Sequence, residues 1–404
     1  MAGVCAHRDN GTMHSSPGTN IELVANASGN PTAIAAAGLI ALAVAMGIGR
    51  FAFTPIMPMM EADAGLTLRA AGWLAAANYL GYFIGALCAA RLSLAQAVRG
   101  GLLLIAVVTF AMGITDVFAL QLLLRLLAGV ASAWVLVHVS AWTLGRLLAM
   151  QRADANGVVY AGVGVGVAAA GLVCMATMQV HWDSNRTWQV FGVLSLLTTL
   201  VLWRNFRGAG KTEVSRSASA RIHWNADKWR LMACYGALGF GYIIPATYLP
   251  DMAHRYITDP LVFGMAWPVF GAASALSTWI AARWLARVND RKLWSACYLL
   301  MMGGVALPAL WPTLTAILVA ALLVGGTYMV VTMLGLREAR RAAGSEATAF
   351  IAVMTAAFAI GQIVGPLLVS AVAHRPHGFA AALLAAAVVV LLAAVSLWRS
   401  SRDA

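Results

Sequence analysis

Long apolar runs alternate with short polar segments along this chain, and each run is about as long as a helix that crosses a bilayer. Such a helix needs about 20 mostly apolar residues. The runs predict an all-α polytopic membrane protein with twelve transmembrane helices, at 33–58, 69–90, 100–115, 118–144, 155–179, 187–204, 229–250, 260–282, 292–308, 312–336, 347–373 and 378–398. The third and ninth runs are short, and their ends are the least sharply marked.

The longest polar loop divides the chain into six predicted helices followed by six more. The stretch GIGRFAFTPIMPMM, which starts at Gly47, is similar to GFGYIIPATYLPDM, which starts at Gly239, so that Arg50 is opposite Tyr242. Two related halves joined by a long loop are typical of secondary transporters. We therefore predict a disordered cytoplasmic tail at 1–32, a six-helix bundle at 33–205, a basic cytoplasmic loop at 206–228, a second six-helix bundle at 229–398 and a cytoplasmic C-terminus at 399–404.

Composition and charge agree with a membrane protein and predict its orientation. Hydrophobic residues make up 61% of the 404 residues and charged residues only 10%, whereas soluble proteins have about 25% charged residues. With the N-terminus inside, 21 of the 27 Lys and Arg residues fall in inner segments and 4 in outer ones, as the positive-inside rule describes. The net charge of +12 then reflects topology in the lipid bilayer rather than nucleic-acid binding. We expect a monomer in the inner membrane, with both termini in the cytoplasm.

The sequence offers no pattern for a metal, a cofactor or a disulfide. The five cysteines stand apart without a C-x-x-C pair, and His374 and His377 have no further ligand nearby in the sequence. The glycines of GVGVGVAAAG follow no strand, so they do not form a dinucleotide-binding turn.

Small residues let membrane helices pack closely and bend. The residues expected in this role are Gly47, Gly49, Gly162, Gly166, Gly361, Gly365 and Pro366.

Several stretches resemble the major facilitator superfamily (MFS), and more narrowly its YbfB/YjiJ-type branch. The resemblance rests on GIGRFAFTPIMP, GWLAAANYLGYFIGAL, RLLAGVASAW, YAGVGVGVAAAGL, GFGYIIPATYLP and GQIVGP, and extends from Ala33 to Trp398. It implies two six-helix bundles that rock around a central cavity lined by helices 1, 4, 7 and 10. It also implies that Arg125, with Gly129 four residues later, is similar to the arginine motif of drug-exporting members. The loop after the second helix departs from the family pattern, because Ala89 stands where an Asp is usual.

Two arginines lie well inside predicted helices, away from the helix ends. At 1.5 Å per residue, Arg50 lies about 12 Å from the end of its helix near Pro58, and Arg125 about 10 Å from the start of its own. An arginine near the bilayer centre costs about 2.5–3.5 kcal/mol on insertion scales, and all 15 acidic residues fall at helix ends, in loops or in tails. A guanidinium matches the oxygens of a carboxylate or phosphate, so we hypothesise that both arginines bind an anionic substrate. Hydrogen bonds to carbonyls freed near Gly49 or Pro55, snorkelling to the interface and chloride are the alternatives.

Other polar and aromatic side chains are predicted at a similar depth. They are Asn78, Tyr79 and Tyr82 in the second helix and Tyr242 in the seventh, with Tyr328 and Thr332 somewhat deeper in the tenth. A tyrosine in a membrane helix more often packs or anchors than binds a ligand, but Tyr242 repeats the position of Arg50. Together with Trp73 and Trp267, these side chains would suit a substrate with an apolar or aromatic body.

Few groups are placed to couple transport to protons. Histidine changes its charge near neutral pH, and Asp116 and Asp251 lie near outer helix ends, so we consider His138 and these two acids as gating or coupling residues. A hydrogen-bonded helix histidine and solvated loop ends are the simpler interpretations.

The sequence thus predicts a secondary transporter and not an enzyme. The preferred substrate is a small organic solute, a carboxylate or other anion with an apolar body, moved by alternating access with or without a coupling proton. The alternative is a proton-coupled efflux pump for drugs or metabolites. A membrane-embedded enzyme would need His, Asp or Glu clustered near one interface, and the sequence has no such cluster.

Overall fold

The computed structural model describes residues 30–152, 155–206, 222–254, 259–284, 288–372 and 374–400. Over these residues the chain forms helices and no strands. Most of the predicted tail and basic loop, and the last four residues of the C-terminus, lie outside the described residues.

The helices follow the apolar runs. The first run forms three consecutive elements, α2 (Pro31–Leu42), η1 (Ala43–Phe51) and α3 (Phe53–Ala64). The others are α4 (Leu68–Cys88), η2 (Ala89–Arg91), η3 (Gln96–Gly100), α5 (Gly101–Met112), α6 (Phe118–Ala149), α7 (Asn156–Gln179), α8 (Ser184–Leu202), α9 (Ala226–His254), α10 (Pro260–Phe263), α11 (Ala266–Trp284), α12 (Asp290–Leu310), α13 (Leu314–Ala343), η7 (Gly344–Glu346), α14 (Ala347–Val372) and α15 (Gly378–Ser400). In the described part, ten helical segments are long and apolar enough to cross a membrane; α8 and the shorter apolar helix Gln96–Met112 are not among them.

Polar residues at helix starts explain where several helices begin. The Thr67 side chain accepts a hydrogen bond from the N–H of Ala70, at 3.2 Å, and Asn289 accepts one from the N–H of Arg291, at 3.0 Å. Such caps satisfy N–H groups that have no partner within the helix. α3 ends at Ala64, and the next residue, Gly65, has a φ of 63°, which lies in the left-handed region that favours glycine. Local sequence therefore sets the helix ends, and the apolar runs set the lengths.

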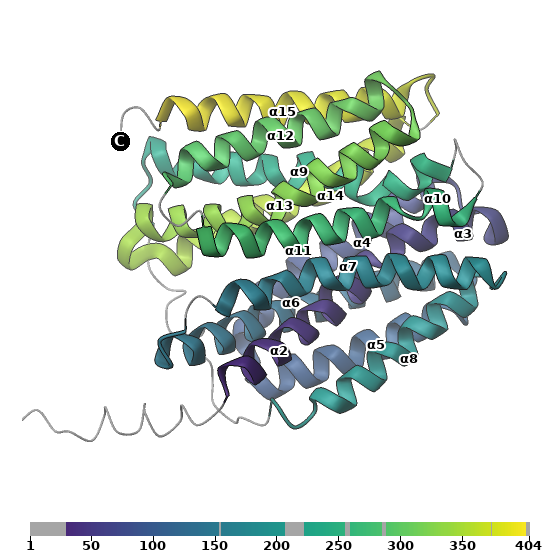
Figure 1. Cartoon of the computed structure of the whole chain (residues 1–404), viewed down its shortest axis with the longest axis horizontal. Helices are drawn as coiled ribbons and strands as arrows, with labels where there is room; N and C mark the ends of the chain where they lie inside the picture. The colour runs from purple at the N-terminus through teal and green to yellow at the C-terminus, as the bar shows by residue number, and fades with distance from the viewer. Residues whose placement is uncertain are drawn as a thin grey trace, which may run out of the picture.

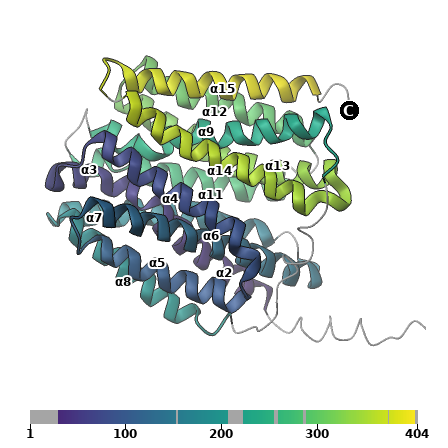
Figure 2. The same ribbon diagram turned by 180° about the vertical axis from the view of Figure 1, so that it is seen from behind.

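The elements before the long loop gather on one side of the molecule and those after it on the other (Figure 1). Helices α5 and α8 form one outer flank and α12 and α15 the opposite flank, also when seen from behind (Figure 2). Between them α4 packs against α14, and α7 against α11. We call α2–α8 the first group and α9–α15 the second group. The end where α9 and α14 begin, which carries Arg337, Arg340 and Arg341, is the basic end, and the end at α10 is the far end.

Apolar side chains cover much of the outer surface of the molecule, as a lipid environment allows. One stripe on α4 contains Trp73, Leu80, Ile84 and Leu87, which are all exposed and recur at helical spacing. Trp73 is 48% exposed, whereas Trp267 is fully buried. The expectation that these two tryptophans share a site is therefore wrong, because Trp73 belongs to the outer face of its helix.

Glycines let helices meet backbone to backbone. A Cβ atom on Gly166 of α7 would lie within 3.0 Å of the backbone of Ala43, and one on Gly47 would lie equally close to the backbone of Gly166. The other predicted packing residues also lie at tight contacts: Gly49 beside Ser132, Gly162 beside Leu39, Gly361 beside Gly236, Gly365 beside Ile243, and the carbonyl of Pro366 beside Gly72. Larger side chains would separate these helices.

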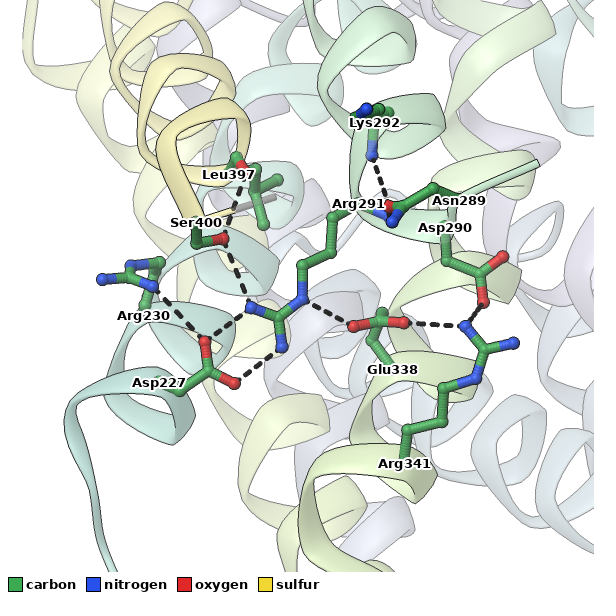
Figure 3. A network of polar contacts seen from close by, with 10 residues as sticks. All are labelled: Asp227, Arg230, Asn289, Asp290, Arg291, Lys292, Glu338, Arg341, Leu397 and Ser400. Carbon is green, nitrogen blue, oxygen red and sulfur yellow. Dashed lines mark hydrogen bonds and ion pairs between the residues drawn. The ribbon is translucent and has the colours of Figure 1, made fainter. Parts of the chain in front are cut away.

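A network of ion pairs joins helices of the second group at the basic end (Figure 3). Arg291 of α12 donates to both carboxylate oxygens of Asp227 on α9, at 2.7 Å each. The same guanidinium donates to Glu338 on α13 at 2.7 Å and to the Ser400 hydroxyl on α15 at 3.3 Å. Arg341 donates to the second oxygen of Glu338, at 3.0 Å. A single arginine thus connects the ends of four helices.

Candidate functional site

The first membrane-spanning segment changes its helical type around Arg50. Residues Ala43–Phe51 form the π-helix η1, between the α-helices α2 and α3. Pro55 follows in α3, and it has no N–H to donate to the carbonyls of the preceding turn. Arg50 is only 2% exposed. π-helical turns often occur at functional sites, and this one carries a positive charge into the interior.

Arg125 of α6 and Asn78 of α4 supply hydrogen bonds to this segment. The Arg125 guanidinium donates to the carbonyl of Arg50 at 3.0 Å and to that of Gly49 at 3.5 Å. The Asn78 amide donates to the carbonyl of Gly49 at 3.2 Å and to that of Arg125 at 2.9 Å. Both side chains are buried. Because bonding to freed backbone carbonyls was one of the alternatives for an intramembrane arginine, Arg125 has the geometry of a positioning residue for the π-helix.

The Arg50 guanidinium contacts neutral groups. It donates to the side-chain oxygen of Gln362 on α14, and the Gln362 amide nitrogen donates to the Tyr242 hydroxyl on α9. The guanidinium carbon lies 4.0 Å from the ring centre of Tyr82 and 5.1 Å from that of Tyr79, within the range of cation–π attraction. Among the described residues no carboxylate pairs with Arg50, and its Nε is buried without a hydrogen-bond partner.

A row of five aromatic rings runs through the interior and ends beside Arg50. The Tyr242 ring stacks on Tyr328 with 5.0 Å between centres, and Tyr328 stacks on Phe270 at 5.3 Å. The Trp267 ring centre lies 5.0 Å from that of Phe270 and 6.2 Å from that of Phe51, in an edge-to-face arrangement. Because Phe51 is the neighbour of Arg50 and Tyr242 is bonded to Gln362, the row provides apolar faces next to the guanidinium.

Hydrogen bonds fasten the two groups of helices together between Arg50 and the far end. Thr54 in α3, one turn beyond Arg50, donates to the carbonyl of Ala246 in α9 at 3.1 Å. Closer to the far end, Ser370 in α14 donates to the carbonyl of Arg69 in α4 at 2.8 Å. The groups are therefore joined on the far-end side of Arg50.

A cavity of about 220 Å³ lies between the two groups toward the basic end. Its walls come from α6, α7, α11 and α13 and include Tyr160, Arg337 and Arg340. Thr332 also lines it, and the Thr332 hydroxyl donates to the carbonyl of Tyr328, at 2.9 Å. This cavity therefore lies on the basic-end side of the aromatic row.

The structure brings together most of the residues singled out from the sequence. Tyr79, Tyr82 and Tyr242 lie around Arg50, and Tyr328 joins them through the ring of Tyr242. The Tyr79 hydroxyl also lies 3.2 Å from the Thr247 hydroxyl of the second group. These side chains come from η1, α4, α9 and α13, so the cluster is built from both groups of helices.

The three residues considered for gating or coupling lie apart from this cluster. His138 is buried, with its ring nitrogens 3.0 and 3.1 Å from the carbonyl oxygens of Trp134 and Leu92. Asp116 is exposed near the far end. Asp251 is 1% exposed within α9, which contradicts the interpretation of a solvated loop end, because α9 continues past the predicted end of the helix.

Gln362 is the site residue that sequence reasoning missed. It is fully buried and lies 312 residues after Arg50. Gln362 belongs to the stretch GQIVGP. Its amide, a polar group that needs a partner in an otherwise apolar membrane helix, was the feature that could have pointed to it. In the described residues no group of three or more His, Cys, Asp or Glu side chains could hold a metal ion.

Comparison with known proteins gives the family. A family model described as an uncharacterised MFS-type transporter, YbfB, matches residues 42–397. The chain belongs to this family. No curated protein matches the MFS-type chain.

Among solved structures, a mutant of the nucleoside transporter NupG is similar, with 14% sequence identity, a TM-score of 0.69, and coverage of 91% of this chain and 99% of the other. At this identity the likeness concerns the fold. Family and fold make the MFS-type chain a multi-pass membrane transporter.

Proposed function

We propose that this chain is a secondary active transporter for a small organic anion with an apolar or aromatic body. One observation carries the proposal: Arg50, buried in the middle of the first membrane-spanning segment, contacts neutral groups and aromatic rings. A buried cation without a counter-ion is costly. A substrate carboxylate would supply the missing negative charge, and the rings of Tyr82, Tyr242 and Tyr328 would bind the apolar body.

Arg125 and Asn78 act as positioning residues in this proposal. Their hydrogen bonds end on the backbone carbonyls of Gly49 and Arg50 rather than in the space beside the guanidinium. They keep the π-helix in the conformation that presents Arg50, and the substrate contacts Arg50 itself. This division of roles replaces the initial hypothesis that both arginines bind the anion.

The arrangement of the helices supports a route that opens to the cytoplasm. We place the basic end on the cytoplasmic side of the inner membrane, because Lys and Arg gather at cytoplasmic helix ends. We also treat the two groups of helices as the two bundles of the family. The hydrogen bonds of Thr54 and Ser370 between the groups then lie between Arg50 and the outer surface, and the cavity of about 220 Å³ lies between Arg50 and the cytoplasm. This conformation corresponds to the inward-facing half of an alternating-access cycle.

A neutral solute with an aromatic ring system is the second candidate. The row of aromatic rings beside Arg50 supports it, because an aromatic lining suits a flat ligand that carries rings. The nucleoside transporter that shares the fold carries a ligand of this kind, as its name states. The two candidates differ in whether a negative charge is required.

Ligand-dependent thermal stability of the purified protein tests the proposal. The probes are benzoate, its neutral counterpart benzyl alcohol, benzylamine and adenosine, each measured with the parent, Arg50→Gln and Arg50→Lys. At a ligand concentration 100 times Kd, binding stabilises the native state by about 2.7 kcal/mol. We expect benzoate to raise the Tm of the parent and of Arg50→Lys, and to have no effect on Arg50→Gln.

Arg186→Gln is the matched control, because Arg186 is an exposed arginine of α8 and its loss removes the same charge. This variant should respond to benzoate as the parent does. Equal responses to benzoate and benzyl alcohol, or a response that survives in Arg50→Gln, would refute the anion proposal. A response to adenosine alone would establish the second candidate.

A further inference from the structure

We propose that Gln362 is a built-in competitor of the substrate: its amide oxygen occupies Arg50 in the absence of substrate, and the substrate's carboxylate displaces it and thereby releases α14 from the first group of helices. The proposal rests on the anion site at Arg50 proposed above. It adds a specificity-determining and coupling residue to that site.

The direction of the Gln362 amide follows from its neighbours. A guanidinium only donates hydrogen bonds, so the group that Gln362 presents to Arg50 must be its oxygen, and its nitrogen then donates to the Tyr242 hydroxyl. The amide oxygen thus stands where a carboxylate oxygen of the substrate would bind. A carboxylate makes the shorter and stronger, charge-assisted hydrogen bond to a guanidinium, so the substrate can replace the amide.

The same bond is also a link between the two groups of helices. Arg50 belongs to the first group and Gln362 to α14 of the second, and the link lies on the basic-end side of the other bonds between the groups. Ser370, whose hydroxyl is bonded to the carbonyl of Arg69, follows Gln362 by about 12 Å along the same helix. A ligand shifts a conformational equilibrium only when it binds one state better than the other. An anion that competes with Gln362 opposes the state closed at the far end, so its binding favours opening there.

Two substitutions at Gln362 have opposite expected effects on anion binding. Gln362→Leu removes the competitor, so benzoate no longer has to displace a hydrogen bond to the charged guanidinium. The free energy of such a bond corresponds to about 10- to 100-fold tighter benzoate binding. Gln362→Glu places a carboxylate of the protein against Arg50, and benzoate binding should fall by about 100-fold or more. Isothermal titration with benzoate measures both. Gln121→Leu in α6, a buried glutamine bonded to the carbonyl of Thr115, is the matched control and should bind benzoate as the parent does.

Opening at the far end is measured separately. Spin labels on cysteines at Ala62 and His374, exposed positions of the first and second group at the far end, report the distance between the groups in a background without the native cysteines. We expect benzoate to lengthen this distance in the parent. Without ligand, Gln362→Leu should lengthen it and Gln362→Glu should keep it short. Gln362→Met replaces the leucine variant if that protein does not fold.

The outcomes separate this inference from the proposed function. If benzoate binds the parent and depends on Arg50, but Gln362→Leu and Gln362→Glu bind it with the affinity of the parent, the anion site stands and the competitor role of Gln362 is overturned. If benzoate fails to bind both the parent and Gln362→Leu, the anion site itself is overturned, and this inference with it. Tighter binding by Gln362→Leu with an unchanged label distance in every variant removes the coupling role.

Discussion

Replacing Arg291 with alanine should destabilise the second group of helices more than any other single loss of charge at the basic end. Arg291 is 14% exposed and donates to both oxygens of Asp227, to Glu338 and to Ser400. Breaking a wholly buried ion pair costs about 3–5 kcal/mol. The Asp227 side chain is 32% exposed, so water recovers part of this free energy. We therefore expect a loss of about 2–4 kcal/mol in the free energy of unfolding, and a fall in Tm of several degrees.

Unfolding of the purified protein in mixed detergent and SDS micelles measures this loss, and Lys292→Ala is the control. Lys292 is the next residue of α12 and forms no ion pair within the described residues, so its loss removes the same charge without breaking the network. A double-mutant cycle with Asp227→Asn should give a coupling energy of at least about 1 kcal/mol. Equal effects of Arg291→Ala and Lys292→Ala, or a coupling energy near zero, would refute the reasoning.

Two further predictions concern packing and pH. Gly166→Val should lower the free energy of unfolding by about 1–3 kcal/mol or prevent folding, because the added side chain meets the π-helix. Gly303→Val should leave the Tm nearly unchanged, because no atom of another helix lies within 4 Å of the added Cβ. Thermal unfolding of both variants checks this. Hydrogen bonds from His223 and Lys228 lower the pKa of the Glu346 carboxyl from 4.5 to about 2. A carboxyl whose pKa is lowered by folding stabilises the protein at pH values above its pKa in the unfolded chain, and this stabilisation is lost as the pH falls toward its pKa in the folded protein. The Tm difference between the parent and Glu346→Gln should therefore be constant above about pH 5. It should shrink from pH 4.5 toward about pH 2. A difference that grows with acidity would contradict this.

The positions of the helices were predictable because each apolar run is a local property of the chain. The sequence also pointed to Arg50, Tyr82 and Tyr242, since charged and polar side chains stand out in apolar runs. Family membership was predictable from the same stretches, and the match over residues 42–397 confirms it.

Other features depend on contacts between segments that are distant in the chain. The partner of Arg50 is Gln362, 312 residues away, and no local pattern connects them. The π-helix arises where Pro55 withholds an N–H and Asn78 and Arg125 bond to backbone carbonyls, which requires three helices to be in place. The exposure of Trp73 depends on which face of α4 meets its neighbours, and α4 is apolar on nearly all sides.

The distance in sequence between Arg50 and Gln362 has a consequence for biosynthesis. The first helix leaves the ribosome with a charged side chain whose acceptor has not yet been made, and at about 5–20 residues per second the 312 intervening residues take about 15–60 s to synthesise. During that interval the guanidinium lacks this acceptor, and water or lipid headgroups take its place. The Arg50 guanidinium therefore gains this hydrogen-bond acceptor only after α14 has entered the membrane. Chains truncated before α14 should be recognised by membrane proteases, because the Arg50 guanidinium of their first helix lacks the hydrogen-bond acceptor that Gln362 provides.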